Sequence, residues 1–252
     1  MSTISINKNP KRIKLIGCDV FTRTLCYFIS QSEHIIDVEF IPMKAHEAPE
    51  ILHDMLQKRI DASLAVKSYD YIILGYGLCG NATVGLSAQV PLIIPRVHDC
   101  CALFLGSNER FLEHFGANLS GQFATDGYIE RCYLEHGIGT FTSLCKQTSL
   151  EYQSYVAQYD RDNADYLWDI MHSNKTPDTI AYISSNTHPV HRLAELNMMA
   201  STNNINVKEI QGDDHFLYTL VNGPWVHKNF LIVPANKAIQ PVYDFDEVMK
   251  SS

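Results

Sequence analysis

Short apolar runs recur along the first half of the chain and alternate with stretches of helical spacing. The runs expected to form strands are Arg12–Cys18, Ile36–Ile41, Tyr71–Leu74 and Val90–Ile94. Helices are expected where apolar residues recur at every third or fourth position. These segments are Thr22–Ser32, a segment that starts at Pro49, and Cys101–Phe115. Strands that alternate with helices in this way predict a parallel sheet with right-handed crossovers.

The same alternation returns in the second half, after a less regular middle that includes an expected helix at Leu150–His172. Strands are expected at Thr179–Ser184, Val207–Ile210 and Phe230–Val233, and helices at Pro189–Ala200 and His215–Leu220. The order strand–helix–strand–helix–strand therefore occurs twice. We expect an α/β protein with two Rossmann-like lobes, each with a parallel sheet, and a cleft between them. The lobes would be residues 1–120 and 121–252, the second with a helical insertion; a single larger sheet is the alternative.

The composition is that of a folded, acidic protein, because 46% of its 252 residues are hydrophobic, 19% are charged and the formal net charge is −8. A surface that binds nucleic acid needs an excess of Lys and Arg, so no nucleic-acid partner is expected. No apolar run reaches the roughly 18 residues of a transmembrane helix, and no membrane contact is expected. The first ten residues lack the apolar core of a signal peptide. The expected location is the cytoplasm, where the seven cysteines would stay reduced.

Cysteine and histidine residues follow the ends of several expected strands. Cys18 ends the first strand, Cys79 lies in the turn after the third, and His98 and Cys100 follow the fourth. Ligands of open parallel sheets bind at the carboxyl ends of the strands, and these three strands are commonly neighbours. Thiolate and imidazole groups are preferred ligands of zinc, and of iron in sulfur-rich sites. The sequence therefore predicts a zinc or iron site, an iron–sulfur centre included, whose ligands are Cys18, Cys79, His98 and Cys100.

The other cysteines are interpreted as packing residues. Cys101 begins an apolar run, and consecutive side chains point in different directions, so Cys100 is assigned to the site and Cys101 to the core. Cys26, Cys132 and Cys145 lie in or beside helical stretches and are expected to behave as small apolar side chains.

The turn between Gly75 and Gly85 is rich in glycine, which lets backbone N–H groups approach an anion. Gly75, Gly77 and Asn81 are therefore candidate cofactor-binding residues. The glycine spacing does not match Gly-x-Gly-x-x-Gly, and the lysine of a P-loop is missing, so no nucleotide is predicted.

Three further residues are candidates for catalysis. Arg96 could clamp an anion with two hydrogen bonds. Asp99 lies between two of the expected metal ligands. His188 follows the first strand of the expected second lobe, together with His191, and could act as a ligand or as a general acid or base.

The chain resembles an uncharacterised family, a domain of unknown function found mostly in anaerobic bacteria and methanogenic archaea. The segments that carry this resemblance are Cys18-Asp19-Val20, Gly75–Asn81, Ile94–Cys100, Gly212-Asp213, Trp225 and Phe230–Pro234. The chain departs from the family pattern at Asp19, where glutamate is expected, and at Ala235-Asn236, where Pro-Gly is expected. The family's genes are often neighbours of genes for corrinoid-dependent methyltransferases. The resemblance therefore implies a role in one-carbon metabolism and implies that the Cys/His positions belong together.

Three hypotheses follow. The first is a metal-dependent enzyme that binds a small molecule and activates a thiol or water, in methyl transfer. The second is a non-catalytic carrier of metal or cofactor that serves a corrinoid protein or methyltransferase. The third is a metal-free enzyme in which Cys79 or Cys100 is a nucleophile activated by His98.

Overall fold

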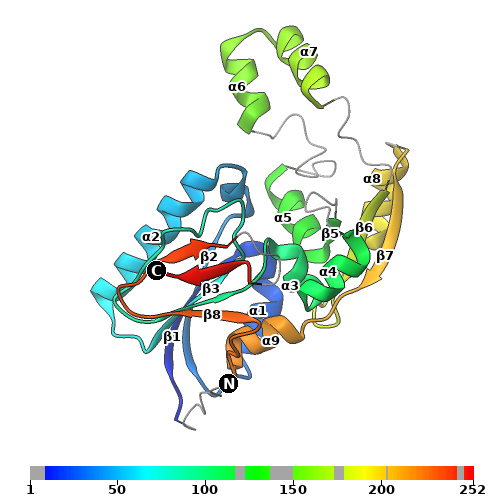
Figure 1. Ribbon diagram of the computed structural model, residues 1–252. Coiled ribbons are helices and arrows are strands. Elements are labelled where there is room, and N and C mark those ends of the chain that lie inside the picture. Colours follow the sequence, from blue (N-terminus) through cyan, green and yellow to red (C-terminus); the bar gives the residue numbers. More distant parts are fainter. Residues whose placement is uncertain (1–8, 117–122, 137–149, 173–178, 203, 243–246) are drawn as a thin grey trace. The chain divides into compact units, whose positions relative to one another are not determined.

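The computed structural model describes residues 9–116, 123–136, 150–172, 179–202, 204–242 and 247–252 (Figure 1). The chain forms two compact units, both mixed α/β with parallel strands. Unit 1 comprises Met1–Leu119, Ser185–Thr187 and Gly212–Ser252, and unit 2 comprises Ser120–Ser184 and His188–Gln211. The expected division after residue 120 stays a prediction, and the compact units differ from it because the residues from Gly212 onward belong with unit 1. In the described part of the chain, no helix is long and apolar enough to cross a membrane.

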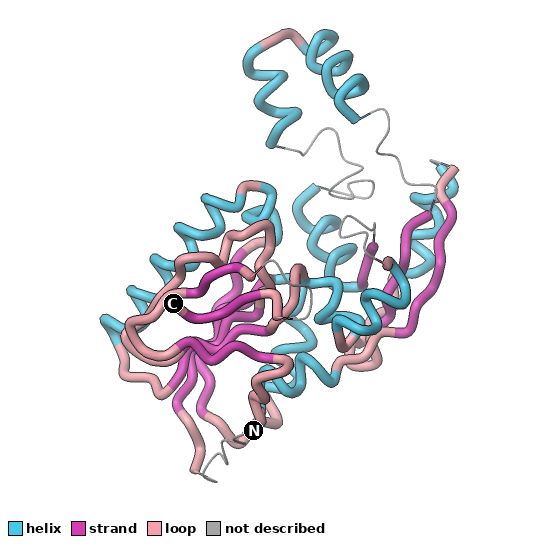
Figure 2. The backbone as a smooth tube through the Cα atoms, in the orientation of Figure 1, coloured by secondary structure: helices cyan, strands magenta, loops and turns pink. Residues whose placement is uncertain are grey.

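Unit 1 is built on a five-stranded sheet with the order β2-β1-β3-β4-β8, drawn with its strands in magenta in Figure 2. The strands are β1 (Arg12–Cys18), β2 (Ile35–Ile41), β3 (Tyr71–Gly75), β4 (Leu92–Pro95) and β8 (Phe230–Val233). The first four are parallel, and β8 is antiparallel to β4. All four strands expected in the first half are confirmed, because continuous apolar runs are typical of strands covered on both faces.

The helices of unit 1 lie on both faces of this sheet. They are α1 (Thr22–Ile29), α2 (Pro49–Val66), α3 (Cys100–Leu105), α4 (Asn108–Phe115) and α9 (His215–Asn222). Because β2 and β3 flank β1 on opposite sides, right-handed crossovers place α1 and α2 on opposite faces, as Figure 1 shows. Helix α9 packs beside α1, where the rings of Phe28 and Tyr218 meet edge to face with centroids 5.5 Å apart.

The single helix expected at Cys101–Phe115 is wrong, because the chain breaks it into α3 and α4. Gly106 ends α3 in the left-handed conformation, with φ of 92°. A side chain there would also collide with Asp213, whose Cβ lies 2.6 Å from the position of an added Cβ. Ser107 then caps α4 by accepting a hydrogen bond from the Arg110 N–H at 3.1 Å.

Unit 2 contains a parallel three-stranded sheet with the order β5-β6-β7. Its strands are β5 (Phe123–Thr125), β6 (Thr179–Ser184) and β7 (Asn206–Gln211), and its helices are α5 (Asp126–His136), α6 (Leu150–Gln158), α7 (Arg161–His172) and α8 (Leu193–Thr202). Two expectations are corrected here. The helix expected at Leu150–His172 is divided, because Asp160 caps a new helix by accepting from the Asn163 N–H at 2.9 Å. Helix α8 begins at Leu193 and not at Pro189, because Arg192 N–H is bound to the Asp126 carboxylate instead.

Strand β8 corrects the expectation that the two halves repeat each other. It was expected as the third strand of the second lobe, yet it pairs with β4 of unit 1, Leu92 opposite Val233. Next to it in sequence, β9 (Ile239–Pro241) and β10 (Met249–Ser251) form an antiparallel pair. A strand of this length can pair with an edge strand of either sheet, and its apolar pattern does not indicate which one.

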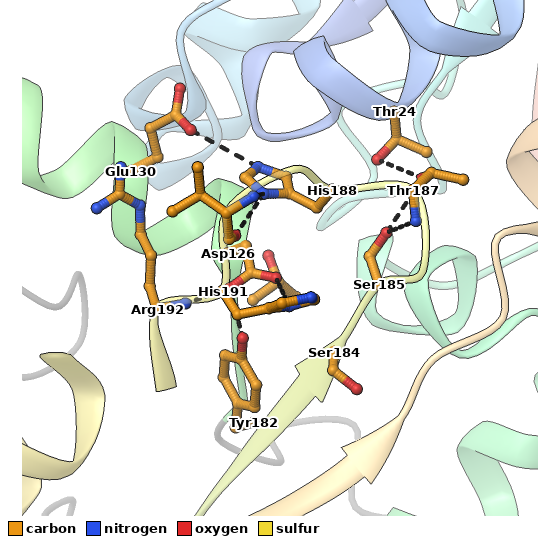
Figure 3. A network of polar contacts seen from close by, with 12 residues as sticks. Thr24, Asp126, Glu130, Tyr182, Ser184, Ser185, Thr187, His188, His191 and Arg192 are labelled. Atoms are coloured by element: carbon orange, nitrogen blue, oxygen red, sulfur yellow. Dashed lines mark hydrogen bonds and ion pairs between the residues drawn. The ribbon is translucent and has the colours of Figure 1, made fainter. Parts of the chain in front are cut away.

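The segment Ser185–Thr187 is anchored to unit 1 by one buried carboxylate, although the residues on either side of it belong to unit 2. Asp214 accepts hydrogen bonds from the Ser185 hydroxyl at 2.8 Å, from the Thr187 hydroxyl at 2.9 Å and from the Thr187 N–H at 3.1 Å. The Thr187 hydroxyl also reaches that of Thr24 at 3.4 Å (Figure 3). The chain therefore returns to unit 1 for three residues between β6 and α8.

Candidate functional site

The strand order of unit 1 reverses at β1, and this reversal positions the candidate site. The chain passes from β1 to β2 on one side and then crosses to β3 on the other. In open α/β sheets, ligands bind outside the carboxyl ends of the strands at such a switch point. Gly17 of β1 is paired with Gly75 of β3, so Cys18 and Tyr76 are the next residues on these neighbouring strands. In unit 2 the order of the described strands does not reverse.

The loops after β3 and β4 are held together by backbone hydrogen bonds. Leu78 N–H donates to Val97 O at 3.0 Å, and Cys79 N–H donates to His98 O at 2.9 Å. This approach requires glycine at position 77, because a Cβ there would lie 2.5 Å from Val97 O. Cys79 and His98, which lie on separate loops, are thereby brought next to each other in the backbone.

The turn that carries Cys79 has an unusual backbone. Cys79, Gly80 and Asn81 have φ values of 46°, 65° and 70°, which places three consecutive residues in the left-handed region. This conformation is uncommon for residues other than glycine. Such strained positions persist only where the surroundings fix them, and they cluster at functional sites.

Burial makes the thiols of this edge poor acids. Cys18 is 5% exposed, and its thiol donates to the Asp19 carboxylate at 3.9 Å. Burial, and then the negative charges of Asp19 and Cys79, raise the pKa of Cys18 well above its ordinary value. Cys79 is half-buried as a residue, and burial of its sulfur, with Asp99 nearby, raises its pKa to about 12. Both side chains are therefore neutral thiols at neutral pH.

Tyr76 is a buried polar residue of this edge that the sequence reasoning did not single out. The residue is 3% exposed, and within the described ranges its buried hydroxyl has no hydrogen-bond partner. Burial raises the pKa of Tyr76 well above its ordinary value, and the charges of Cys18, Cys79, Asp19 and Cys100 raise it further. The phenol thus lies within electrostatic reach of three thiols. Its place between two glycines at the end of a buried strand was the available signal.

His98 and Asp99 have distinct environments. Burial lowers the pKa of His98, so its imidazole is neutral at neutral pH, as a metal ligand must be. Asp99 caps α3 by accepting from the Cys101 N–H at 2.8 Å, and burial raises the pKa of this carboxyl group. Cys101 is 1% exposed, which confirms its assignment to the core.

Cys26 corrects another expectation, because it is exposed on α1 and does not pack in the core. The eight residues of α1 present a mixed surface, and a small polar or apolar side chain fits its outer face. Cys145 and the side chain of Cys132 lie outside the described residues.

Arg96 is 3% exposed, and its guanidinium group contacts the end of the chain. It donates hydrogen bonds to the backbone oxygens of Glu247, at 2.8 Å, and Met249, and to His227 Nε2 at 3.2 Å. These contacts tie β10 to the loop after β4 within unit 1. The clamping of an anion by Arg96 stays a prediction, as do the cofactor contacts of Gly75, Gly77 and Asn81.

The thiols gather at one edge, but they are not yet in the geometry of a metal site. Across residues 9–116 and the other described ranges, no group of three or more His, Cys, Asp or Glu side chains is arranged to hold a metal ion. Occupancy by zinc or iron would therefore require rotation of side chains at Cys18, Cys79, His98 and Cys100.

His188 belongs to a separate polar cluster in unit 2 (Figure 3). Its Nε2 lies 3.6 Å from the Glu130 carboxylate, and its Nδ1 lies 2.7 Å from Val190 O. One turn earlier on α5, the 1%-exposed Asp126 accepts from the Tyr182 hydroxyl and lies 3.5 Å from His191 Nδ1. The sequence reasoning missed both carboxylates, because they follow a three-residue strand in the irregular middle of the chain.

The family comparison covers most of this arrangement. The family described as "Protein of unknown function (DUF1638)" matches residues 40–221. The chain belongs to this family. The matched residues include Tyr76, Cys79, His98 and Cys100, whereas Cys18 precedes them. Searches of curated proteins and of solved structures found no match.

Proposed function

We propose that unit 1 is the metal-binding part of an enzyme that acts on a small molecule. Cys18, Cys79, His98 and Cys100 would supply three or four ligands to one zinc or iron ion, and with three protein ligands the fourth position is open to the substrate. The observation that carries this proposal is that Cys18, Cys79 and Cys100 all lie within electrostatic reach of the buried hydroxyl of Tyr76, at the switch point of the sheet.

The protonation of the thiols favours metal over a metal-free nucleophile. A reactive cysteine needs a lowered pKa, from a nearby cation or a helix amino terminus. Burial raises the pKa of Cys18 and that of Cys79 instead. A bound metal ion would deprotonate these thiols outright, and its positive charge would balance the thiolates that form. The neutral imidazole of His98 suits the same role.

The metabolic setting is part of the proposal. We assign the enzyme to methyl transfer in one-carbon metabolism, with a corrinoid protein or methyltransferase as partner, on the resemblance described above. A bound metal would activate a thiol or water there. We also propose that both units are Rossmann-like and that the protein acts in a reducing cytoplasm. A carrier that uses the same cysteines is the second candidate, and it is supported by the same gathering of thiols.

Metal content tests the proposal. The protein is purified without oxygen, with and without added zinc or iron, and analysed for metal beside Cys79→Ser and His98→Ala. Cys26→Ser is the matched control, because Cys26 is exposed on α1. We expect about one metal ion per chain in the wild type and in Cys26→Ser, and none in the other two variants. A wild type that stays metal-free under all these conditions refutes the proposal.

A chelator then separates enzyme from carrier. The metal is titrated out with a coloured chelator while its release is followed by absorbance. Slow release, with displacement of a metal-bound water by an added thiol, supports the enzyme. Rapid and complete release without any exogenous ligand supports the carrier.

A further inference from the structure

The hydroxyl of Tyr76 is buried in unit 1 and lacks a hydrogen-bond acceptor among the described residues. The residue is 3% exposed. A buried polar group in this state costs free energy, and native proteins rarely keep one without a reason. Removing the hydroxyl alone would relieve that cost, so its presence indicates a partner that joins the site later.

The neighbours of Tyr76 indicate what this partner is. Gly75 of β3 is paired with Gly17 of β1. Tyr76 and Cys18, the residues that come next, therefore lie side by side at the ends of these two strands. Cys79 lies three residues further along the same loop, and its backbone is tied to His98 O at 2.9 Å. The sulfur atoms of Cys18, Cys79 and Cys100 all lie within electrostatic reach of the phenol.

Among the described residues, no sulfur atom lies in hydrogen-bonding geometry with the Tyr76 hydroxyl of the metal-free site, so a ligand side chain would have to turn towards it. A thiol sulfur is a weak acceptor, whereas an anionic sulfur is a strong one. The thiol proton of Cys18 is directed to the Asp19 carboxylate, which also accepts from Met43 N–H at 2.9 Å. Asp19 is therefore already engaged by two donors. A metal-bound thiolate would be a strong acceptor beside Tyr76 once the cysteine side chains turn towards a metal ion.

We propose that Tyr76 donates a hydrogen bond to a cysteine sulfur of the metal-loaded site, and that it thereby positions this ligand and adjusts the metal. The inference rests on the proposed function, since it requires the metal. Tyr76 is a positioning residue, because it acts through a ligand. Partners of this kind typically change metal affinity by about 10–100-fold.

The test compares Tyr76→Phe with the wild type, using zinc affinity by competition and the sulfur-to-metal charge-transfer spectrum of the Co²⁺-loaded protein. We expect the melting temperature of the metal-free variant to equal or exceed that of the wild type. We expect its zinc affinity to fall about 10–100-fold and the charge-transfer band to shift. Tyr69→Phe is the control: its hydroxyl, also in unit 1, donates to Asp37 at 2.7 Å, so zinc affinity should be unchanged.

The outcomes separate the inference from the proposed function. If Tyr76→Phe binds zinc as tightly as the wild type, with the same Co²⁺ spectrum, the inference is overturned and the metal site stands. If Tyr76→Phe lowers the free energy of unfolding of the metal-free protein by as much as it lowers the free energy of zinc binding, Tyr76 supports the fold only. The inference is then overturned as well. If the wild type binds neither zinc nor Co²⁺, both proposals fail together.

Discussion

The hydrogen bond between Tyr182 and Asp126 allows a local test of the reasoning about buried polar groups. Tyr182 lies on β6 and Asp126 begins α5, and each is 1% exposed. The Tyr182 hydroxyl and the Arg192 N–H, at 2.8 Å, both donate to Asp126 Oδ1. Tyr182→Phe keeps the ring in place and removes one donor from a carboxylate that water does not reach.

The expected cost follows from the charge of the acceptor. A hydrogen bond to a charged group contributes about 1.5–3 kcal/mol, so we expect unit 2 to lose about 2 kcal/mol. Native-state hydrogen exchange read by mass spectrometry reports this locally, whichever unit unfolds first. Peptides that contain Thr179–Ser184 should exchange about 30-fold faster in the variant, because 1.4 kcal/mol corresponds to a factor of ten.

Tyr76→Phe in the metal-free protein is the matched comparison. Tyr76 is also a buried tyrosine, but its hydroxyl has no acceptor within the described residues. Peptides that contain Tyr71–Gly75 should therefore exchange at the wild-type rate or more slowly. Unchanged exchange in β6 after Tyr182→Phe, or equal acceleration by both substitutions, would contradict this expectation.

Three further predictions concern unit 1. Gly77→Ala should cost about 1–3 kcal/mol in urea unfolding, because its Cβ would lie 2.5 Å from a backbone oxygen of the loop after β4; wild-type stability would contradict this. Asp214→Ala should release residues 185–187, which it binds by three hydrogen bonds at 2.8–3.1 Å, and faster proteolytic cleavage there would show it. Burial and the Asp37 carboxylate raise the pKa of Tyr69 to about 12. The folded protein then keeps a proton that the unfolded chain loses near pH 10, so stability falls from about pH 10 towards pH 12, and less steeply in Tyr69→Phe.

The controls for these predictions are available in the same unit. Gly116→Ala places a Cβ where no atom lies within 4 Å, so any loss there reports backbone strain at φ of 59° and not collision. Ser185→Ala removes one of the donors to Asp214 and should release the segment less than Asp214→Ala does.

The sequence was sufficient to predict those strands whose apolar run is long enough to be buried on both faces of a sheet. Strands β1 to β4 were found for this reason. The common site of Cys18, Cys79, His98 and Cys100 stays a prediction. Strand β5 has three residues and no periodicity to detect. The break between α3 and α4 could have been predicted, because Gly106-Ser107 is a stop signal followed by a cap.

The remaining features depend on contacts that the sequence does not encode locally. The apolar run of β8 predicts a strand, but nothing in that run indicates that its partner is β4, which lies far away in the sequence. The role of Tyr76 depends on a missing acceptor, which only the three-dimensional arrangement reveals. The later start of α8, at the hydrogen bond from the Arg192 N–H to Asp126, could not be predicted either, because these two residues are far apart in sequence.

The division of unit 1 into three separate pieces of chain has a consequence for synthesis on the ribosome. Strand β8 completes the sheet of unit 1, yet it is translated after all of unit 2. Domains generally fold as units, in the order in which their residues emerge. Unit 2 therefore has its whole sequence available first, while the edge of β4 waits for its neighbour. During that interval the nascent chain exposes an unpaired strand edge, which makes truncated products that end before residue 230 prone to aggregation.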